Sequence, residues 1–188
     1  MTSLMLQEAM SAGDCVALQL TKDVERYAEL GRTLRSTSFH SAVTVARGSS
    51  DHASGYVAYL IMSRLGRLVT SLPMSLVTLY KSPLVTRDTL AISISQSGQS
   101  PDVVEPIQYF RDGGATTVAL VNDAESPLAQ SAAWTMPLHA GKEQSVAATK
   151  SFIASLVAGA RLVAEWQGDE ELKAGLRALP DALENAAR

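Results

Sequence analysis

The chain has 188 residues, a length that suits one α/β domain or one domain with an appended segment. Hydrophobic residues make up 46% of it, enough for a sizeable core, and the net charge of −3 predicts no nucleic-acid partner. Cys15 is the single cysteine. It excludes an internal disulfide framework, disfavours a cysteine-based zinc site and fits a reducing compartment, the cytoplasm.

No stretch of the chain is typical of a membrane segment. Residues 1–10 lack the basic start and apolar core of a signal peptide. The longest apolar region, residues 145–166, is interrupted by Lys150 and Arg161. These charges favour a buried helix over a membrane span, so we expect no membrane partner.

Apolar periodicity predicts helices and strands in alternation along most of the chain. Strands are expected at residues 42–46, 68–71, 90–95, 116–121 and 133–136. Helices are expected at 3–10, 14–34, 48–65, 102–111, 127–131, 145–166 and 169–187, with a short helix or loop at 73–80.

This alternation predicts an α/β fold with a five-stranded parallel, flavodoxin-like sheet and helices on both faces. Ligands of such sheets bind outside the carboxyl ends of the strands. Two serine-rich loops, residues 48–50 and 95–100, each directly follow a predicted strand. We therefore expect both loops at the same edge of the sheet.

The loop at 95–100 has the composition of an anion site. The hydroxyls of Ser95, Ser97 and Ser100 are possible donors, and so are the backbone N–H groups around Gly98 at the start of a helix. Phosphate is the commonest small anion held in this way. The alternative is that Ser100 is only a helix cap and the other residues are ordinary loop.

The loop at 48–50 repeats this arrangement after the first strand. Ser49 or Ser50 either bonds a ligand or caps the following helix. Neither the dinucleotide fingerprint GxGxxG nor the phosphate loop GxxxxGK[ST] occurs in the chain. We therefore predict no nucleotide and no other cofactor.

Side chains with acid–base chemistry are few near these loops. His52 follows the first loop, where a histidine more often bonds the helix start than catalyses a reaction. His139, Lys142 and Glu143 offer a base, a cation and an acid, but such residues are also ordinary loop surface. We assign no catalytic residue, and the three histidines lack the spacing of metal ligands, so no metal is expected.

Three motifs resemble a known family. ARGSSDHAS at 46–54, SISQSGQSPD at 93–102 and KEQSVAATKSF at 142–152 are together similar to the sugar isomerase (SIS) domain. They are most like the isomerase half of glutamine–fructose-6-phosphate aminotransferase and the isomerase-type glucosamine-6-phosphate deaminase. The resemblance covers residues 4–166 and implies a sheet that binds sugar phosphates.

The resemblance also implies a role for particular residues. Phosphate would be held by the loop after the third strand, Ser50 would contact sugar or phosphate, and the backbone of Val146 would line the sugar pocket. The family usually has Thr at position 100 and Glu at position 99. Ser100 keeps the hydroxyl, whereas Gln99 lacks the carboxylate. The candidate substrate-binding residues are Ser49, Ser50, Ser95, Gln96, Ser97, Gly98, Ser100 and Val146.

The family carries two such modules in tandem, with its catalytic Glu, His and Lys in or after the second. We therefore interpret the chain as a helical lead (1–40), a SIS domain (41–167) and a helix (168–188) that leads to a missing second module. The family's aminotransferase has a nucleophilic cysteine directly after its first Met, where this chain has Thr2. This difference favours a deaminase or isomerase over a glutamine-dependent synthetase.

The implied ligands are a hexose 6-phosphate or an amino-hexose 6-phosphate, bound by a homodimer. The implied reaction converts glucosamine 6-phosphate to fructose 6-phosphate plus ammonia, or runs in reverse. One alternative is a non-catalytic sugar-phosphate sensor. Another is a structural α/β domain whose serines only cap helices.

Overall fold

The computed structural model describes residues 3–145 and 148–187. The strands are β1 (Ser41–Val45), β2 (Val69–Ser71), β3 (Thr89–Ser95), β4 (Thr116–Val121) and β5 (Trp134–Pro137). The helices are α1 (Leu4–Met10), α2 (Ala12–Thr21), α3 (Val24–Ser36), α4 (Ser49–Leu65), α5 (Ser75–Thr78), α6 (Pro101–Asp112), α7 (Pro127–Ser131), α8 (Lys150–Gln167) and α9 (Glu170–Ala186).

The strands form one parallel sheet in the order β2-β1-β3-β4-β5. This is the flavodoxin-like order, so the predicted fold class is confirmed. The chain leaves β1 toward β2 on one side and leaves β3 toward β4 on the other. The point where the direction of winding reverses therefore lies between the carboxyl ends of β1 and β3.

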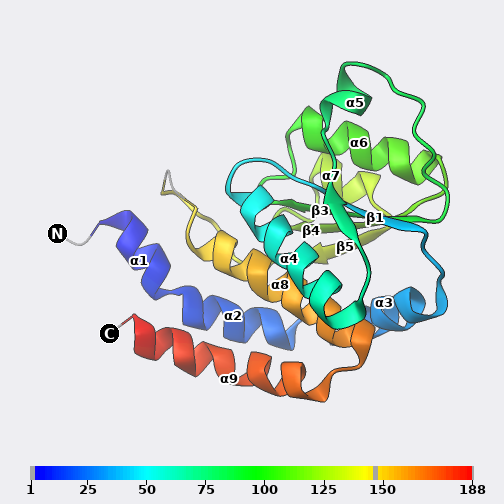
Figure 1. The fold of residues 1–188 in the computed structure, drawn as a ribbon. Coiled ribbons are helices and arrows are strands. Elements are labelled where there is room, and N and C mark those ends of the chain that lie inside the picture. The colour runs from blue at the N-terminus through cyan, green and yellow to red at the C-terminus, as the bar shows by residue number, and fades with distance from the viewer. Residues whose placement is uncertain (1–2, 146–147, 188) are drawn as a thin grey trace.

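Helices cover both faces of the sheet (Figure 1). The helices α3, α4 and α8 pack on one face, and α5, α6 and α7 pack on the other. Outside the first group, α2 and α9 lie against α8 as a further layer. The described residues contain no helix whose length and hydropathy suit a bilayer crossing.

The central strand β3 shows why the sheet forms. Leu90, Ile92 and Ile94 pack toward α4 and α8, and Ala91 packs toward α6, because successive side chains of a strand point to opposite faces. Burying each of the three larger side chains contributes roughly 1.5–3 kcal/mol. The hydroxyl of Ser93 donates to the carbonyl of Val45 at 2.8 Å, so even its polar group is satisfied inside the sheet.

Two helix predictions were wrong in their bounds. The predicted helix 14–34 is two helices, because Asp23 adopts the left-handed conformation (φ 53°) and turns the chain between α2 and α3. Apolar spacing continues across this break, which is why the pattern alone missed it. The helix expected from residue 145 begins at Lys150, since side-chain carboxylates bond the backbone just before it. The division of the chain at residues 40 and 167 stays a prediction.

Candidate functional site

A hollow lies where β1 and β3 end, at the reversal of winding. Its volume is ≈ 360 Å³, and both serine-rich loops contribute to it. Its lining consists of Arg47, Ser50, Ile94, Ser95, Gln96, Ser97, Ser100 and Val103. Ligands of doubly wound sheets bind in this type of crevice, so the hollow is the candidate functional site.

Five of the eight candidate residues line the hollow: Ser50, Ser95, Gln96, Ser97 and Ser100. Ser49 is exposed in the first turn of α4, next to the lining but outside it. Gly98 does not line the hollow, but its conformation sets the path of the loop. Val146 lies outside the described residues.

Gly98 is required by the path of the loop. Its φ is +63°, and an added Cβ would lie 2.7 Å from Cβ of Ser126 and 2.9 Å from Cγ2 of Val121. Its N–H donates to Oγ of Ser95 at 3.0 Å, and its carbonyl accepts from the N–H of Leu128 at 3.1 Å. Only glycine combines this conformation with this close approach, so the loop is fixed against α7.

The serines at the two helix starts do not cap their helices. Ser100 occupies the N-cap position of α6, yet its side chain accepts no capping hydrogen bond. The N-cap of α4 is Gly48, so neither serine of that loop fills this position. The hydroxyls therefore remain available to a ligand, beside two helix N-termini whose dipoles attract anions. This geometry argues against the interpretation that Ser100 is only a cap.

The sequence analysis did not single out Arg47. An Nη of its guanidinium donates to Oγ of Ser100 at 3.2 Å and to Oδ2 of Asp102 at 2.7 Å. Its side chain is 59% exposed, so the ion pair with Asp102 contributes only about 0–1 kcal/mol to stability. A basic residue just after a strand at the reversal point is the signal that would have revealed it.

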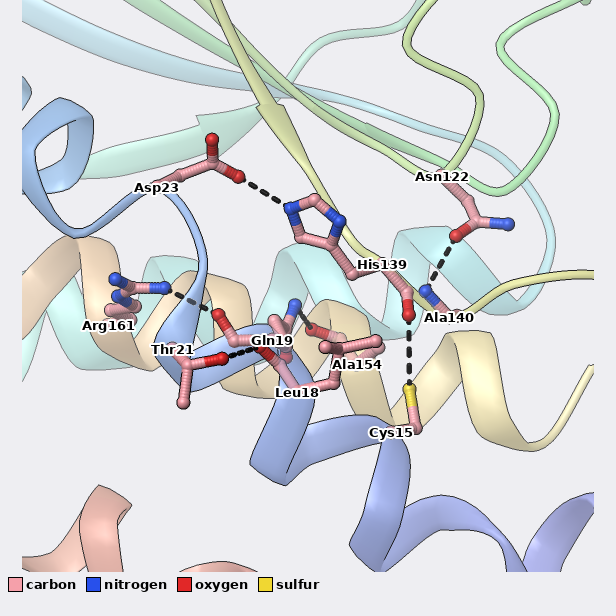
Figure 2. A network of polar contacts seen from close by, with 10 residues as sticks. All are labelled: Cys15, Leu18, Gln19, Thr21, Asp23, Asn122, His139, Ala140, Ala154 and Arg161. Carbon is pink, nitrogen blue, oxygen red and sulfur yellow. Dashed lines mark hydrogen bonds and ion pairs between the residues drawn. The ribbon is translucent and has the colours of Figure 1, made fainter.

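The side chains considered for acid–base chemistry lie away from the hollow or have structural partners. His52 is exposed on α4 and does not line the hollow. Nε2 of His139 lies 2.5 Å from Oδ2 of Asp23, which joins the loop after β5 to the turn between α2 and α3 (Figure 2). The carboxylate of Glu143 accepts from the N–H of Thr149 at 2.9 Å and so caps the start of α8.

Figure 2 shows how the beginning of the loop after β5 is held. Oδ1 of Asn122 accepts from the N–H of Ala140 at 2.8 Å. The amide group of Asn122 also donates to the carbonyl of Gly141 at 2.8 Å. The Cys15 thiol lies 3.8 Å from the carbonyl of His139. Burial raises the pKa of this thiol, which favours its neutral form as a hydrogen-bond donor.

Comparison with known proteins places these features in one family. The family model of the SIS domain matches residues 37–164. A glutamine–fructose-6-phosphate aminotransferase (isomerizing) of Thermus thermophilus is 34% identical over 147 residues, which are 78% of this chain and 24% of that protein.

Solved structures agree. A protein of Silicibacter pomeroyi DSS-3, provisionally described as a phosphosugar isomerase, is 41% identical with a TM-score of 0.94, over 98% of this chain and 57% of that one. The glucosamine-6-phosphate deaminase of Thermotoga maritima is 19% identical with a TM-score of 0.74, over 95% of this chain and 54% of that one, and shows the shared fold.

The chain thus spans about a quarter of the curated relative and just over half of the two solved structures. The matched region contains all five strands and both loops of the hollow. On its sequence and its fold, the chain belongs to the SIS domain family.

Proposed function

We propose that this chain is the sugar-phosphate-binding module of an aminosugar-phosphate isomerase or deaminase. The observation that carries the proposal is the convergence of hydroxyls from two loops, one arginine and two helix N-termini on one hollow. The ligand is a hexose 6-phosphate or an amino-hexose 6-phosphate, with its phosphate among Ser95, Gln96, Ser97 and Ser100. Ser50 and Arg47 approach it from the β1 side.

A phosphate ester gains from this arrangement because hydrogen bonds to a charged group are worth about 1.5–3 kcal/mol each. The binding energy is collected far from the carbons that react. It therefore serves to orient C1 and C2 of the open-chain sugar, and the backbone around Val146 would line the sugar itself.

The reaction that we propose is an isomerisation coupled to loss or gain of ammonia. In open-chain glucosamine 6-phosphate, one proton moves from C2 to C1 and a second moves from the amino nitrogen to O1, which converts the C1 aldehyde and C2 amine into a C1 alcohol and a C2 imine. Addition of one water to the imine releases ammonia and leaves fructose 6-phosphate. The reverse sequence aminates fructose 6-phosphate.

The groups that move these protons are assigned to a second module. None of the eight side chains that line the hollow is a histidine, a lysine or a carboxylate. General acid–base catalysis contributes about 10²–10⁴-fold, so a module without such groups binds but does not turn over substrate by itself. We further propose that the protein works as a cytoplasmic homodimer.

The same hollow, with donors but no acid–base side chain in its lining, also suits a second function, that of a non-catalytic sugar-phosphate sensor. Assay of the full-length protein with glucosamine 6-phosphate separates the two. Release of fructose 6-phosphate and ammonia supports the enzyme, whereas binding without turnover of any hexose 6-phosphate supports the sensor.

Calorimetry tests the anchor that both functions share. We expect fructose 6-phosphate to bind and fructose not to bind, with the affinity for the ester lost in Ser97→Ala. Equal affinity for the sugar and its phosphate ester would contradict the phosphate site.

A further inference from the structure

The loop between β5 and α8 is held by a carboxylate from the other end of the chain. Glu8 of α1 accepts a hydrogen bond from the N–H of Gln144 at 2.6 Å and from the N–H of Ser145 at 3.1 Å. The side-chain hydroxyl of Ser145 also donates to the Glu8 carboxylate. Since Gln144 and Ser145 belong to no helix or strand, Glu8 supplies the acceptors that regular structure would otherwise provide.

Glu8 differs sharply from the rest of its helix. It is 7% exposed, whereas Leu4, Met5, Leu6 and Met10 of the same helix are 44–52% exposed. Helix α1 lies at the outer end of α2, away from the sheet (Figure 1). The buried residue of α1 is therefore a charged one, and its bonds attach the helix to the loop.

The hydrogen bonds keep this carboxylate ionised. The Ser145 hydroxyl and the Gln144 N–H hold the pKa of Glu8 below its usual value. A charged acceptor makes stronger hydrogen bonds than a neutral one. These charge-assisted bonds therefore restrain the backbone of residues 144–145.

The loop that Glu8 holds lies at the edge of the sheet that also carries the hollow. All strands run parallel, so the loop after β5 leaves the same edge of the sheet as the loops of the hollow. Two strand spacings, about 10 Å, separate β5 from β3. The backbone N–H of Asn122 donates to the carbonyl of Ser95 at 3.4 Å, and the Asn122 side chain bonds Ala140 and Gly141, so the start of this loop lies beside the lining of the hollow. A six-carbon chain whose phosphate is fixed at the end of β3 and that extends toward β5 would meet this loop.

We propose that Glu8 is a positioning residue for the sugar: it fixes residues 144–145 so that the loop after β5 meets the carbon chain of a bound hexose phosphate. This inference rests on the proposed function of the hollow. Helix α1 thereby becomes part of the binding machinery without contact to the ligand.

A second carboxylate of the same loop provides the contrast. Glu143 bonds the N–H of Thr149 and both the N–H and the hydroxyl of Ser151, at the start of α8. These bonds cap a helix, so Glu143→Gln should lower thermal stability. The hydrogen bonds of Glu8 go to Gln144 and Ser145, ahead of α8, and only a weaker charge attraction reaches Lys150 at the start of that helix, so the loss of Glu8 should act mainly on the loop.

The test compares Glu8→Gln with the wild type in the full-length protein. Calorimetry with inorganic phosphate reports the anchor alone, and calorimetry with fructose 6-phosphate reports anchor plus loop. We expect about tenfold weaker binding of fructose 6-phosphate, from the loss of charge-assisted bonds, and an unchanged Kd for phosphate. Hydrogen exchange should speed up at the amides of Gln144 and Ser145. Glu125→Gln, an exposed residue of the loop after β4, is the matched control and should change none of these values.

The other outcomes contradict either the positioning role of Glu8 or the proposed function of the hollow. Faster exchange with unchanged fructose 6-phosphate affinity overturns the positioning role and leaves the anchor intact. Equal losses for phosphate and fructose 6-phosphate also overturn it, because the effect would then be general. A wild-type protein that binds neither ligand removes the proposed function and this inference with it. If Glu8→Gln does not fold, Glu8→Asp keeps the charge but shortens the reach, and must still weaken only the sugar ester.

Discussion

Two serine–proline pairs precede helices in this chain, and the structure uses them differently. Ser126, before α7, is 1% exposed, and its Oγ accepts from the N–H of Ala129 at 3.3 Å. Ser100, before α6, makes no capping bond with its side chain and receives an N–H of Arg47 at 3.2 Å. The same dipeptide thus stabilises one helix and leaves a hydroxyl toward a hollow at the other.

The difference follows from the positions of the two helix starts. Ser126 lies beneath the loop of residues 95–100, against the position that a Cβ of Gly98 would take. Ser100 lies on the open side of that loop, between the ends of β1 and β3. The hydroxyl of Ser126 therefore supports its own helix, whereas the hydroxyl of Ser100 lines the hollow and has Arg47 as its neighbour.

The largest expected effect comes from crowding the contact between the loop of residues 95–100 and Ser126 before α7. Gly98→Ala places a methyl group against Ser126 and Val121 at a positive φ. We expect a loss of about 2–4 kcal/mol in the free energy of unfolding, from backbone strain and overpacking, and loss of phosphate-ester binding. Urea denaturation and calorimetry measure the two effects. Gly55→Ala is the control, because its Cβ would meet open space within a helix. A variant as stable as wild type that still binds the ester would refute the role of Gly98.

Removing the cation should affect binding and leave stability intact. Arg47→Gln deletes the charge beside Ser100 and an exposed ion pair. We expect about 10- to 100-fold weaker binding of fructose 6-phosphate, since a charge-assisted bond to phosphate is lost, with less than about 1 kcal/mol of destabilisation. Calorimetry and thermal melting check both values.

Arg111→Gln is the matched control for Arg47. Its guanidinium bonds the carbonyl of Gln130 at 3.0 Å and does not line the hollow. Ester binding should therefore be unchanged in this variant. Similar losses of affinity in both variants would mean that net charge, and not the position of Arg47, attracts the ligand.

Replacing each of the two serines by alanine tests whether their hydroxyls have different roles. Ser126→Ala removes a cap and should lower stability by about 1 kcal/mol with little change in ester affinity. Ser100→Ala should weaken ester binding about fivefold, through loss of one hydrogen bond, with little change in stability. Chemical denaturation and calorimetry on both variants give four values. If Ser100→Ala destabilises the fold as much as Ser126→Ala does, its hydroxyl is structural after all.

The fold could be predicted from the sequence because its strands and helices have strong local sequence signals. The strand at 116–121 and the helix at 127–131 have the observed bounds, since buried β-branched runs and a Ser–Pro start are strong local signals. The break at Asp23 and the late start of α8 depend on distant partners such as His139 and Glu8. No periodicity contains that information.

The candidate site divides in the same way. The grouping of the serines at one hollow was predictable, because hydroxyls after parallel strands must share one edge of the sheet. Whether each serine caps its helix or lines the hollow depends on tertiary position, as Ser100 and Ser126 show. Arg47 and Glu8 were missed because their partners, Ser100 and Ser145, lie 53 and 137 residues away along the chain.

The smallest expected effect has the opposite sign to the others. Asp102 shares Arg47 with Ser100 and holds a negative charge, 53% exposed, at the rim of a hollow proposed for an anion. Asp102→Asn removes repulsion of the phosphate and frees the guanidinium, so we expect about threefold tighter binding of fructose 6-phosphate at low salt. The gain should shrink as salt rises, because exposed charges are screened. Calorimetry at two ionic strengths checks this, and weaker binding in Asp102→Asn would show that the carboxylate orients Arg47 more than it repels the ligand.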